Sequence, residues 1–490
     1  MRLRLLILLA CLCAVRPLAA QPAPVTIGQS FLTGSLDASE GPAGWALASH
    51  GVAEKLFTVD RSGKVVGALA TTAERLGVNQ WRVRLRGDRF FSDGTPVVAA
   101  DVAAALMRTG ERNAAARASA GRITVEATDP ATLMLTSERS TPIMASVLAE
   151  WAFAVYRQAG NGFLYSGPYA VETYRPGDQL LLKANPHHAG MAGKEPVRVR
   201  RFADTQAMAL AFENGEVDLA FNLPVETLPR LRARRDTTVR SFPVAYQYMM
   251  WINTGRPGLH DPLVRRAIDL AIDRRELVAA VQGGVPATGA FATTYAFAER
   301  EVRPFDPAAA GRLLDQAGWR LDGDGKRRKD GRTLDIVLVA YPSRPELPVL
   351  QPVIRARLAA LGLNPQTRIV EQATAVATAR DFDLLLWAQH TAPAGDPGFF
   401  LNAFFRTGAG NNYASYSSPR VDALLDRLAG VEAAEGRAAL SGDIQRQLFE
   451  DVPVSFLITP AWHLAYGPRI LRYEPWGSDY DIVRADLATK

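Results

Sequence analysis

The sequence predicts an α/β fold with mixed or parallel sheets and an added antiparallel region near the N-terminus. Two observations indicate this fold class. Between residues 81 and 186, short runs of alternating apolar residues flank turns rich in Gly, Pro and Asp, which is typical of antiparallel hairpins. After about residue 200, helical patterns alternate with near-continuous apolar runs such as 334–342 and 382–389. Such runs are typical of strands covered on both faces.

Three segments make up the expected antiparallel region. In 81–108, Trp81 and Leu85 belong to an alternating run that precedes a Ser-Asp-Gly-Thr-Pro turn and then a helix. The segments 123–137 and 166–186 each contain two alternating runs around a turn with proline. We expect each of these two segments to form a hairpin.

The later helices start with a shared pattern. In 260–284, Asp261 can cap the helix and Pro262 occupies the first turn, where its missing N–H costs nothing. A capping residue followed by proline recurs in 305–319 and 417–430. The pattern therefore predicts three helices in the second half of the chain.

The length and the charge of the chain limit its possible classes of function. A chain of 490 residues is long enough for two or three domains with sizeable cores. The net charge is +6, and the basic runs 230–235 and 326–332 are interrupted by turn residues. Such runs are typical of solvated loops, so we expect no nucleic-acid partner.

The N-terminus has the layout of a secretory signal peptide. Two early arginines precede an apolar stretch and small residues that end at Ala20, which predicts a signal over 1–20 and a periplasmic protein starting near Gln21. The alternative is a lipoprotein, because Leu-Leu-Ala before Cys11 resembles a lipidation site. Since Cys11 and Cys13 are the only cysteines, export without lipid would leave no disulfide and no thiol ligand or nucleophile.

The sequence lacks the common catalytic motifs. The sequence has no G-x-S-x-G, H-E-x-x-H, Walker or G-x-G-x-x-G motif, which argues against an exported hydrolase, the remote alternative. The segment 322–333 begins like a calcium loop but has Lys326 at the fifth position and Thr333 at the twelfth, so we interpret it as a β-hairpin. Of the histidines, His390 and His463 follow apolar runs and are candidates for ligand contact.

Several segments, in order, resemble the extracytoplasmic solute-binding proteins of the peptide/nickel class of ABC importers, solute-binding protein family 5. They are "FSDGTPVVAADVAAALMR", "SGPYAVETYRPGDQLLLKANP", "ALAFENGEVDLAF", "NTGRPGLHDPLVRRAIDLAIDRRELV", "FDPAAAGRLLDQAGW" and "YSSPRVDALLDRL". The resemblance is collinear over nearly the whole mature chain. One departure is Val98, where the family usually has Ser or Thr as a helix cap.

The resemblance implies a two-lobed periplasmic-binding-protein fold of the class II type, with the ligand enclosed between the lobes and an extra subdomain in lobe I. The chain should cross between lobes within 244–254 and return within 456–466. The implied division is a signal at 1–20, lobe I at 21–245 with the extra subdomain at about 45–165, lobe II at 246–460, and a return to lobe I at 461–490.

The resemblance also implies function. We expect the substrate-binding component of an ABC import system, which is not an enzyme, needs no cofactor and acts as a monomer. It would capture a small peptide or peptide-like solute and deliver it to a permease in the inner membrane. The alternative is a nickel or metal-chelate binder, because "TAPAGDP" resembles the loop of those relatives too. They use paired arginines, whereas 148–158 offers Trp151, Phe153 and Arg157, which favours the peptide.

The resemblance suggests which residues meet the ligand. In peptide-binding relatives the aspartate of an Asp-Pro loop pairs with the α-ammonium group of the ligand, and Asp396 stands at that position. A bound cation would compensate this carboxylate when the cleft closes. Trp387, Phe399 and Phe400 would line the same pocket. The alternative is that Asp396 caps the helix that begins after Pro397.

Four further residues complete the expected site. His390 follows the strand that contains Trp387. Tyr246, Trp251 and Asn253 lie on the first crossing between the lobes. We expect these side chains to face the cleft.

Overall fold

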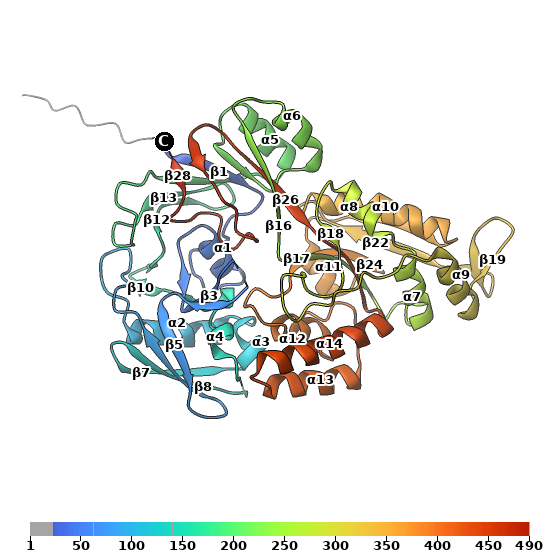
Figure 1. The fold of residues 1–490 in the computed structure, drawn as a ribbon, viewed down its shortest axis with the longest axis horizontal. Helices are drawn as coiled ribbons and strands as arrows, with labels where there is room; N and C mark the ends of the chain where they lie inside the picture. Colours follow the sequence, from blue (N-terminus) through green and yellow to red (C-terminus); the bar gives the residue numbers. More distant parts are fainter. Residues whose placement is uncertain (1–22, 62, 140, 490) are drawn as a thin grey trace, which may run out of the picture.

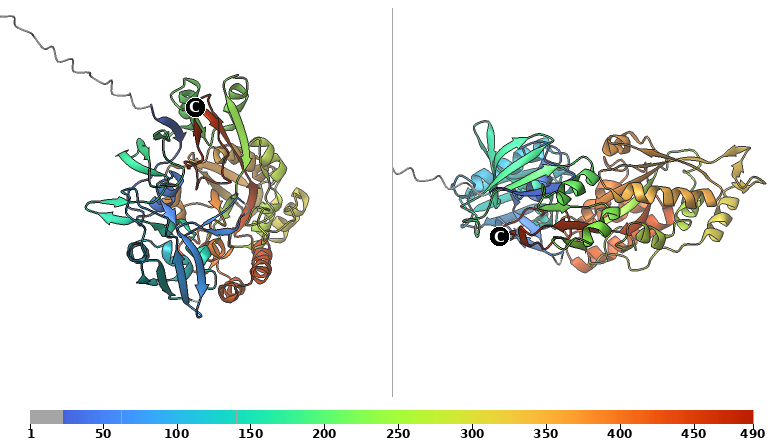
Figure 2. Two further views of the ribbon diagram at one scale, coloured as in Figure 1. Left: turned by 60° about the vertical axis from the view of Figure 1, so that its left-hand side comes forward. Right: turned by 90° about the horizontal axis from the view of Figure 1, so that it is seen from above.

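The structure, a computed structural model, describes residues 23–489 except Ser62 and Ser140. The predicted signal peptide, with Cys11 and Cys13, lies outside the described residues. Figure 1 shows two lobes side by side, and Figure 2 shows that they form the two ends of an elongated molecule.

The first lobe is built on a seven-stranded mixed sheet. Its strand order is β12-β13-β14-β1-β15-β26-β16, with β1 parallel to β14 and β15 and the other pairs antiparallel. The strands are β1 (Val25–Gln29), β12 (Tyr169–Arg175), β13 (Gln179–Ala184), β14 (Val197–Arg201), β15 (Leu219–Phe221), β16 (Thr238–Pro243) and β26 (Ala461–Tyr466). Helices α5 (Thr205–Glu213) and α6 (Leu228–Arg232) lie at the top of this lobe (Figure 1).

An antiparallel sheet with its own core is attached to the first lobe. Its order is β5-β6-β8-β7, and α2 (Ala99–Arg112) packs on it. The strands are β5 (Ala70–Arg75), β6 (Gln80–Leu85), β7 (Ile123–Asp129) and β8 (Thr132–Ser137). Trp81 and Leu85 point into a core separate from that of the rest of the molecule, as the alternation predicts. Val98 makes no side-chain cap at the start of α2.

Short elements make up the rest of the first lobe and of the region around this sheet. They are α1 (Ala43–Ser49), β2 (Glu54–Lys55), β3 (Phe57–Val59), β4 (Val65–Gly67), α3 (Ala116–Ala120), α4 (Met144–Val147), η1 (Trp151–Phe153), β9 (Ala154–Val155), β10 (Arg157–Ala159), β11 (Gly162–Leu164), η2 (Val225–Thr227), β27 (Ile470–Arg472) and β28 (Ala488–Thr489).

The second lobe is built on a six-stranded mixed sheet of order β18-β25-β17-β24-β22-β23. The strands are β17 (Tyr246–Ile252), β18 (Val285–Pro286), β22 (Asp335–Ala340), β23 (Asn364–Ile369), β24 (Leu384–His390) and β25 (Val454–Thr459). The helices are α7 (Pro262–Leu270), α8 (Arg274–Ala280), α9 (Pro307–Gln316), α10 (Glu346–Ala360), α11 (Ala373–Ala379), α12 (Gly398–Phe405), α13 (Pro419–Gly430) and α14 (Ala434–Asp451). As the cap-and-proline pattern predicts, Asp261, Asp306 and Ser418 accept hydrogen bonds from the first turns of α7, α9 and α13.

Two features of the second lobe show how its sheet is built. β24 is buried along nearly its whole length and β22 is buried at four of its six residues, which agrees with the apolar runs 382–389 and 334–342. The segment that begins like a calcium loop lies in a small antiparallel sheet of β19 (Arg320–Leu321), β20 (Arg327–Lys329) and β21 (Arg332–Thr333). This small sheet projects from the far end of the lobe (Figure 1).

The chain passes between the two large sheets at two adjacent points. β16 belongs to the first sheet and β17 to the second, so the chain crosses at Val244 and Ala245. It returns at Pro460, between β25 and β26. The N–H of Val244 donates to the carbonyl oxygen of Pro460 at 3.2 Å, so the two crossings are hydrogen-bonded to each other.

Candidate ligand-binding cleft

Two cavities lie between the lobes and share His390 and Tyr480 in their walls. The first, of about 490 Å³, is called the aromatic chamber here because Trp45, Trp151, Tyr246, Trp387, Phe399 and Tyr413 line it. The second, of about 840 Å³, lies against the two crossings and is called the hinge chamber. Its walls include Lys55, Tyr295, Trp476 and Asp481.

The first lobe closes the aromatic chamber with Trp45 and Tyr480. Trp45 stacks on Phe31 with ring centroids 4.4 Å apart and lies 6.5 Å from the ring of Tyr480. Gly44 lets α1 approach η1, since a Cβ at this position would lie 2.7 Å from the carbonyl oxygen of Trp151. Both tryptophans are thereby held at the wall of one chamber.

The second lobe contributes Trp387 from the buried strand β24. Its ring makes edge contacts with Tyr341 and Tyr413, at centroid distances of 5.7 and 5.3 Å. Its indole N–H donates to Gln389 Oε1 at 3.2 Å. Because the ring is 9% exposed and fixed by its neighbours, it presents a rigid face to the chamber.

His390 ends β24 at the junction of the two chambers. Its ring lies edge-on to Tyr246 and Tyr480, at 5.3 and 5.1 Å. Burial lowers the pKa of His390 to about 4, and the nearby Asp479 only partly opposes this. The imidazole is therefore neutral at pH 7. Since Nδ1 is buried without a hydrogen-bond partner, Nε2 is the nitrogen through which His390 can contact a ligand.

A buried ion pair joins the lobes beside the aromatic chamber. Arg344, in the second lobe, donates to Asp479 Oδ2 at 2.8 Å, and Asp479 lies in the C-terminal segment that returns to the first lobe. Tyr246 donates to the other oxygen of the same carboxylate at 2.7 Å. The guanidinium lies over the rings of Tyr246 and Trp462, at 5.1 and 4.9 Å. Both charges are thus compensated within the protein.

Asp396 lies in a different environment from the one expected. Its carboxylate accepts two hydrogen bonds from Arg437, at 2.6 and 2.7 Å, and one from the backbone N–H of Gly398 at 2.7 Å. The sequence led us to expect that a bound cation would compensate this carboxylate, whereas Arg437 of α14 supplies a cation within the protein. The bond to Gly398 also ties the carboxylate to the start of α12, as the capping alternative expected.

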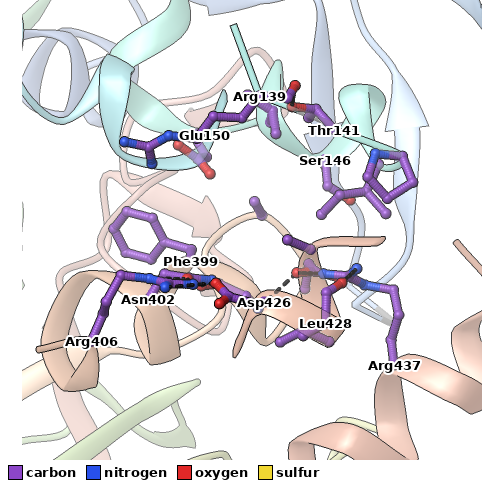
Figure 3. A pocket seen from close by; sticks show the side chains of 17 residues that line it. Arg139, Thr141, Ser146, Glu150, Phe399, Asn402, Arg406, Asp426, Leu428 and Arg437 are labelled. Atoms are coloured by element: carbon purple, nitrogen blue, oxygen red, sulfur yellow. Dashed lines mark hydrogen bonds and ion pairs between the residues drawn. The ribbon is translucent and has the colours of Figure 1, made fainter. Parts of the chain in front are cut away.

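The cavity next to Asp396 is separate from the two chambers. It has a volume of about 320 Å³ and lies between the segment 139–150 and helices α12 and α13. Figure 3 shows Thr141 and Ser146 on one side and Asn402 and Asp426 on the other. Among the residues that the structure describes, Phe399 alone lines both this cavity and the aromatic chamber.

The structure brings four of the predicted site residues together around the aromatic chamber. They are Tyr246, Trp387, His390 and Phe399. Trp251 is fully buried, and its ring stacks on Phe404 at 5.7 Å. Successive side chains of a strand point to opposite faces, and Trp251 stands an odd number of positions from Tyr246 along β17. The Trp251 ring therefore points to the face of the sheet opposite to that of Tyr246.

Three other candidates also have partners inside the protein. Asn253 donates to the carbonyl oxygens of Arg380 and Phe382, at 3.1 Å each. Phe400 is fully buried in the core. His463 is buried, and its Nδ1 is 2.8 Å from Ser241 Oγ. Asn253, Phe400 and His463 line none of the three cavities described above.

Sequence reasoning missed Trp45, Arg344 and Tyr480, and two of the four charged residues that line the hinge chamber, Lys55 and Asp481. Trp45 and Tyr480 stand in segments rich in Gly, Ser and Pro, and an aromatic residue in such a segment is a signal for binding. Nothing local marks Lys55 or Asp481. Within residues 23–489, as far as they are described, no group of three or more His, Cys, Asp or Glu could hold a metal ion, and no helix is long and apolar enough to cross a membrane.

Comparison with known proteins agrees with this architecture. A model of the bacterial extracellular solute-binding proteins, family 5, matches residues 64–412. The chain belongs to this family. Protein XP55 of Streptomyces lividans is 30% identical over 311 residues, which are 60% of this chain and 55% of that protein. The glutathione-binding protein GsiB of Escherichia coli (strain K12) is 29% identical over 325 residues, 61% of this chain and 62% of that protein.

The match thus spans 55 to 62% of the length of these two family 5 relatives. Among solved structures, NikA of Staphylococcus aureus in complex with Ni(L-His)2 has a TM-score of 0.85 at 20% identity, and covers 95% of this chain and 100% of that chain. The family and the two-lobed α/β fold inferred from the sequence are therefore confirmed.

Proposed function

We propose that this family 5 protein is the substrate-binding component of an ABC import system, and that it captures a small peptide or peptide-like solute between its lobes. The aromatic chamber carries this proposal. Its walls come from both lobes, and rigid rings surround a neutral imidazole. Such walls suit a small organic solute, which would be held by apolar contacts and a few hydrogen bonds. Glutathione, named for the relative GsiB, is a peptide of this size.

A solute enclosed from both lobes has to enter and leave, so the lobes must separate. The two hydrogen-bonded crossings at Val244 and Pro460 are the short segments that would bend, with lobe I before the first crossing and lobe II between them. Hinge closure around a ligand is common in such binders. In this function the protein works in the periplasm as a monomer after loss of the signal peptide. It delivers its solute to an inner-membrane permease and catalyses no reaction.

A metal chelate is the second candidate, and one observation favours it. His390 is neutral because burial lowers its pKa to about 4, and a neutral imidazole nitrogen facing a chamber is a suitable metal ligand. NikA of Staphylococcus aureus, which shares the fold, was crystallised with Ni(L-His)2.

Titration calorimetry on ligand-free protein separates the two candidates. The probes are glutathione, a set of dipeptides and tripeptides, and Ni²⁺ with L-histidine. We expect binding of a peptide and a loss of at least about tenfold in affinity in Trp387→Leu, because an aromatic wall is removed. Trp319→Leu is the matched control, since Trp319 is also 9% exposed but lines none of the three cavities.

Two results would change the assignment. Binding of nickel with L-histidine alone, abolished in His390→Gln, would replace the peptide by the chelate. Equal loss of affinity in Trp387→Leu and Trp319→Leu would show that the aromatic chamber is not the site.

A further inference from the structure

Lys55 is a buried cation for which the described residues supply no ion-pair partner. It lies on β2 and is 9% exposed. Its Nζ donates to the carbonyl oxygen of Ala149 at 2.7 Å, and within the part of the chain that the structure describes no carboxylate forms an ion pair with it. Burial lowers the pKa of Lys55, although Asp481 and Glu150 oppose this from a distance. Two of the three ammonium N–H groups are therefore left for other acceptors.

Asp481, in the wall of the same chamber, is an anion in the same situation. It is half-buried in the C-terminal segment, and its carboxylate makes no hydrogen bond or ion pair with any residue the structure describes. Burial raises the pKa of Asp481, and the charges of Lys55, Arg484 and Arg61 oppose this. Two positions earlier, Asp479 is fully compensated by Arg344 and Tyr246.

Both side chains line the hinge chamber. They are more than 4.0 Å apart, since no ion pair forms between them. The chamber therefore holds a positive and a negative group that do not compensate each other, and Asp60 and the exposed Arg61 also line it. Desolvating a charge without a partner is costly. Some other buried charges of this protein are paired, for example Arg274 with Asp269. Groups that lower stability in this way are typical of binding sites.

We propose that the hinge chamber is a subsite for a zwitterion, in which Lys55 receives a carboxylate of the solute and Asp481 receives its ammonium group. This inference rests on the function proposed above and adds the chemistry of the solute. His390 and Tyr480 belong to both chambers, so the remainder of the solute passes between them into the aromatic chamber. The two charged groups are either those of one amino-acid head or the two ends of a short peptide.

Calorimetry with end-blocked probes tests the subsite. The probes are glutathione, which has an ammonium and a carboxylate on one carbon, and dialanine, which has them at its two ends. Each probe is used in three forms: free, N-acetylated, and amidated. The amide replaces the carboxylate nearest the ammonium group in glutathione and the C-terminal carboxylate in dialanine. The proteins are wild type, Lys55→Met and Asp481→Asn, with Lys64→Met and Asp486→Asn as controls because both side chains are exposed.

We expect wild type to bind a free probe about 30-fold or more tightly than either blocked form, since one charge of a desolvated pair is then unpaired. Asp481→Asn should lose the discrimination against the acetylated form, and Lys55→Met that against the amide. The controls should discriminate as wild type does. If glutathione shows this discrimination, the two charges are those of one amino-acid head. If dialanine shows it, they are the two ends of a short peptide.

The possible failures are distinct. If wild type binds peptides but does not discriminate between free and blocked ends, or if the two variants discriminate as wild type does, the zwitterion subsite is wrong and the proposed function stands. If wild type binds neither these probes nor other peptides, the proposed function fails and this inference fails with it.

Discussion

Two acids at the interface between the lobes, the buried Asp396 and the half-buried Asp481, have opposite environments. The Asp396 carboxylate accepts three hydrogen bonds, two of them from Arg437. Asp481 lines the hinge chamber with Lys55, and neither side chain has an ion-pair partner among the described residues. Both regions contain a buried charge, but only in the first does the protein itself compensate it.

This difference distinguishes a charge with a structural role from a charge that a ligand would compensate. A paired carboxylate such as Asp396 ties the start of helix α12 to helix α14 within the protein itself. An uncompensated pair such as Lys55 and Asp481 gains most when a complementary solute arrives. Burial and charge alone therefore do not identify a binding residue, and the partners of each charge have to be examined.

The largest expected effect concerns the compensated pair. Asp396→Asn leaves Arg437 buried without an anion, so we expect the free energy of unfolding to fall by about 3 to 5 kcal/mol. Urea unfolding measures it. Asp426→Asn is the control, because Asp426 pairs with Arg406 but its side chain is 72% exposed, and an exposed pair contributes about 1 kcal/mol or less. Equal, small effects would show that Asp396 is not a structural charge.

The second prediction concerns the positive charge that His390 would gain on protonation, at the junction of the two chambers. Burial lowers the pKa of His390 to about 4 from 6.5, so the unfolded chain binds a proton more readily than the folded protein between these values. The contribution to stability is fully present above pH 6.5 and is lost as the pH falls towards 4.

We therefore expect His390→Gln to reduce the loss of stability between pH 7 and pH 4 by about 3 kcal/mol relative to wild type. Urea unfolding at a series of pH values measures this difference. His260→Gln is the control, because His260 is exposed. A pH dependence unchanged in His390→Gln would mean that the ring is protonated without penalty and that the chamber is more polar than its walls indicate.

The third prediction concerns the uncompensated charges. In ligand-free protein, Lys55→Met replaces a desolvated ammonium by an apolar chain of similar length, so the free energy of unfolding should rise by about 1 kcal/mol. Thermal melts of dialysed, refolded protein measure it, with Lys64→Met as the control. A marked fall in stability would show that the hydrogen bond from Lys55 to Ala149 is structural, and would remove the contrast with Asp396.

The smallest effect on stability is expected from an exposed ion pair between the lobes. Arg75 and Glu432 form an ion pair at 2.8 Å between the antiparallel sheet and the second lobe, with side chains 28% and 58% exposed. Arg75→Gln should change stability by about 0.5 kcal/mol, and less at high salt. Small-angle scattering should show the same radius of gyration as wild type. An expanded form would mean that this exposed pair holds the lobes together.

The amino-acid sequence by itself determined much of the architecture and part of the site. Alternating and continuous apolar runs fixed the strands, since the side-chain period of a strand is local. Trp387 and His390 were found because they stand on and just after such a run. Tyr246 followed from the resemblance, while Trp251 and Asn253 on the same segment proved to be buried in the second lobe, because the face a side chain takes depends on the register of the sheet.

Tertiary structure alone decided the roles of the charges. Arg437 is 41 positions from Asp396, and Asp479 is 233 positions from Tyr246, so no local pattern could show that these groups are partners. The same holds for Lys55 and Asp481, which come from opposite ends of the chain and meet only because the C-terminal segment returns to the first lobe. Whether a buried charge is compensated is a property of three-dimensional neighbours, and for this reason the sequence could name Asp396 but could not assign its partner.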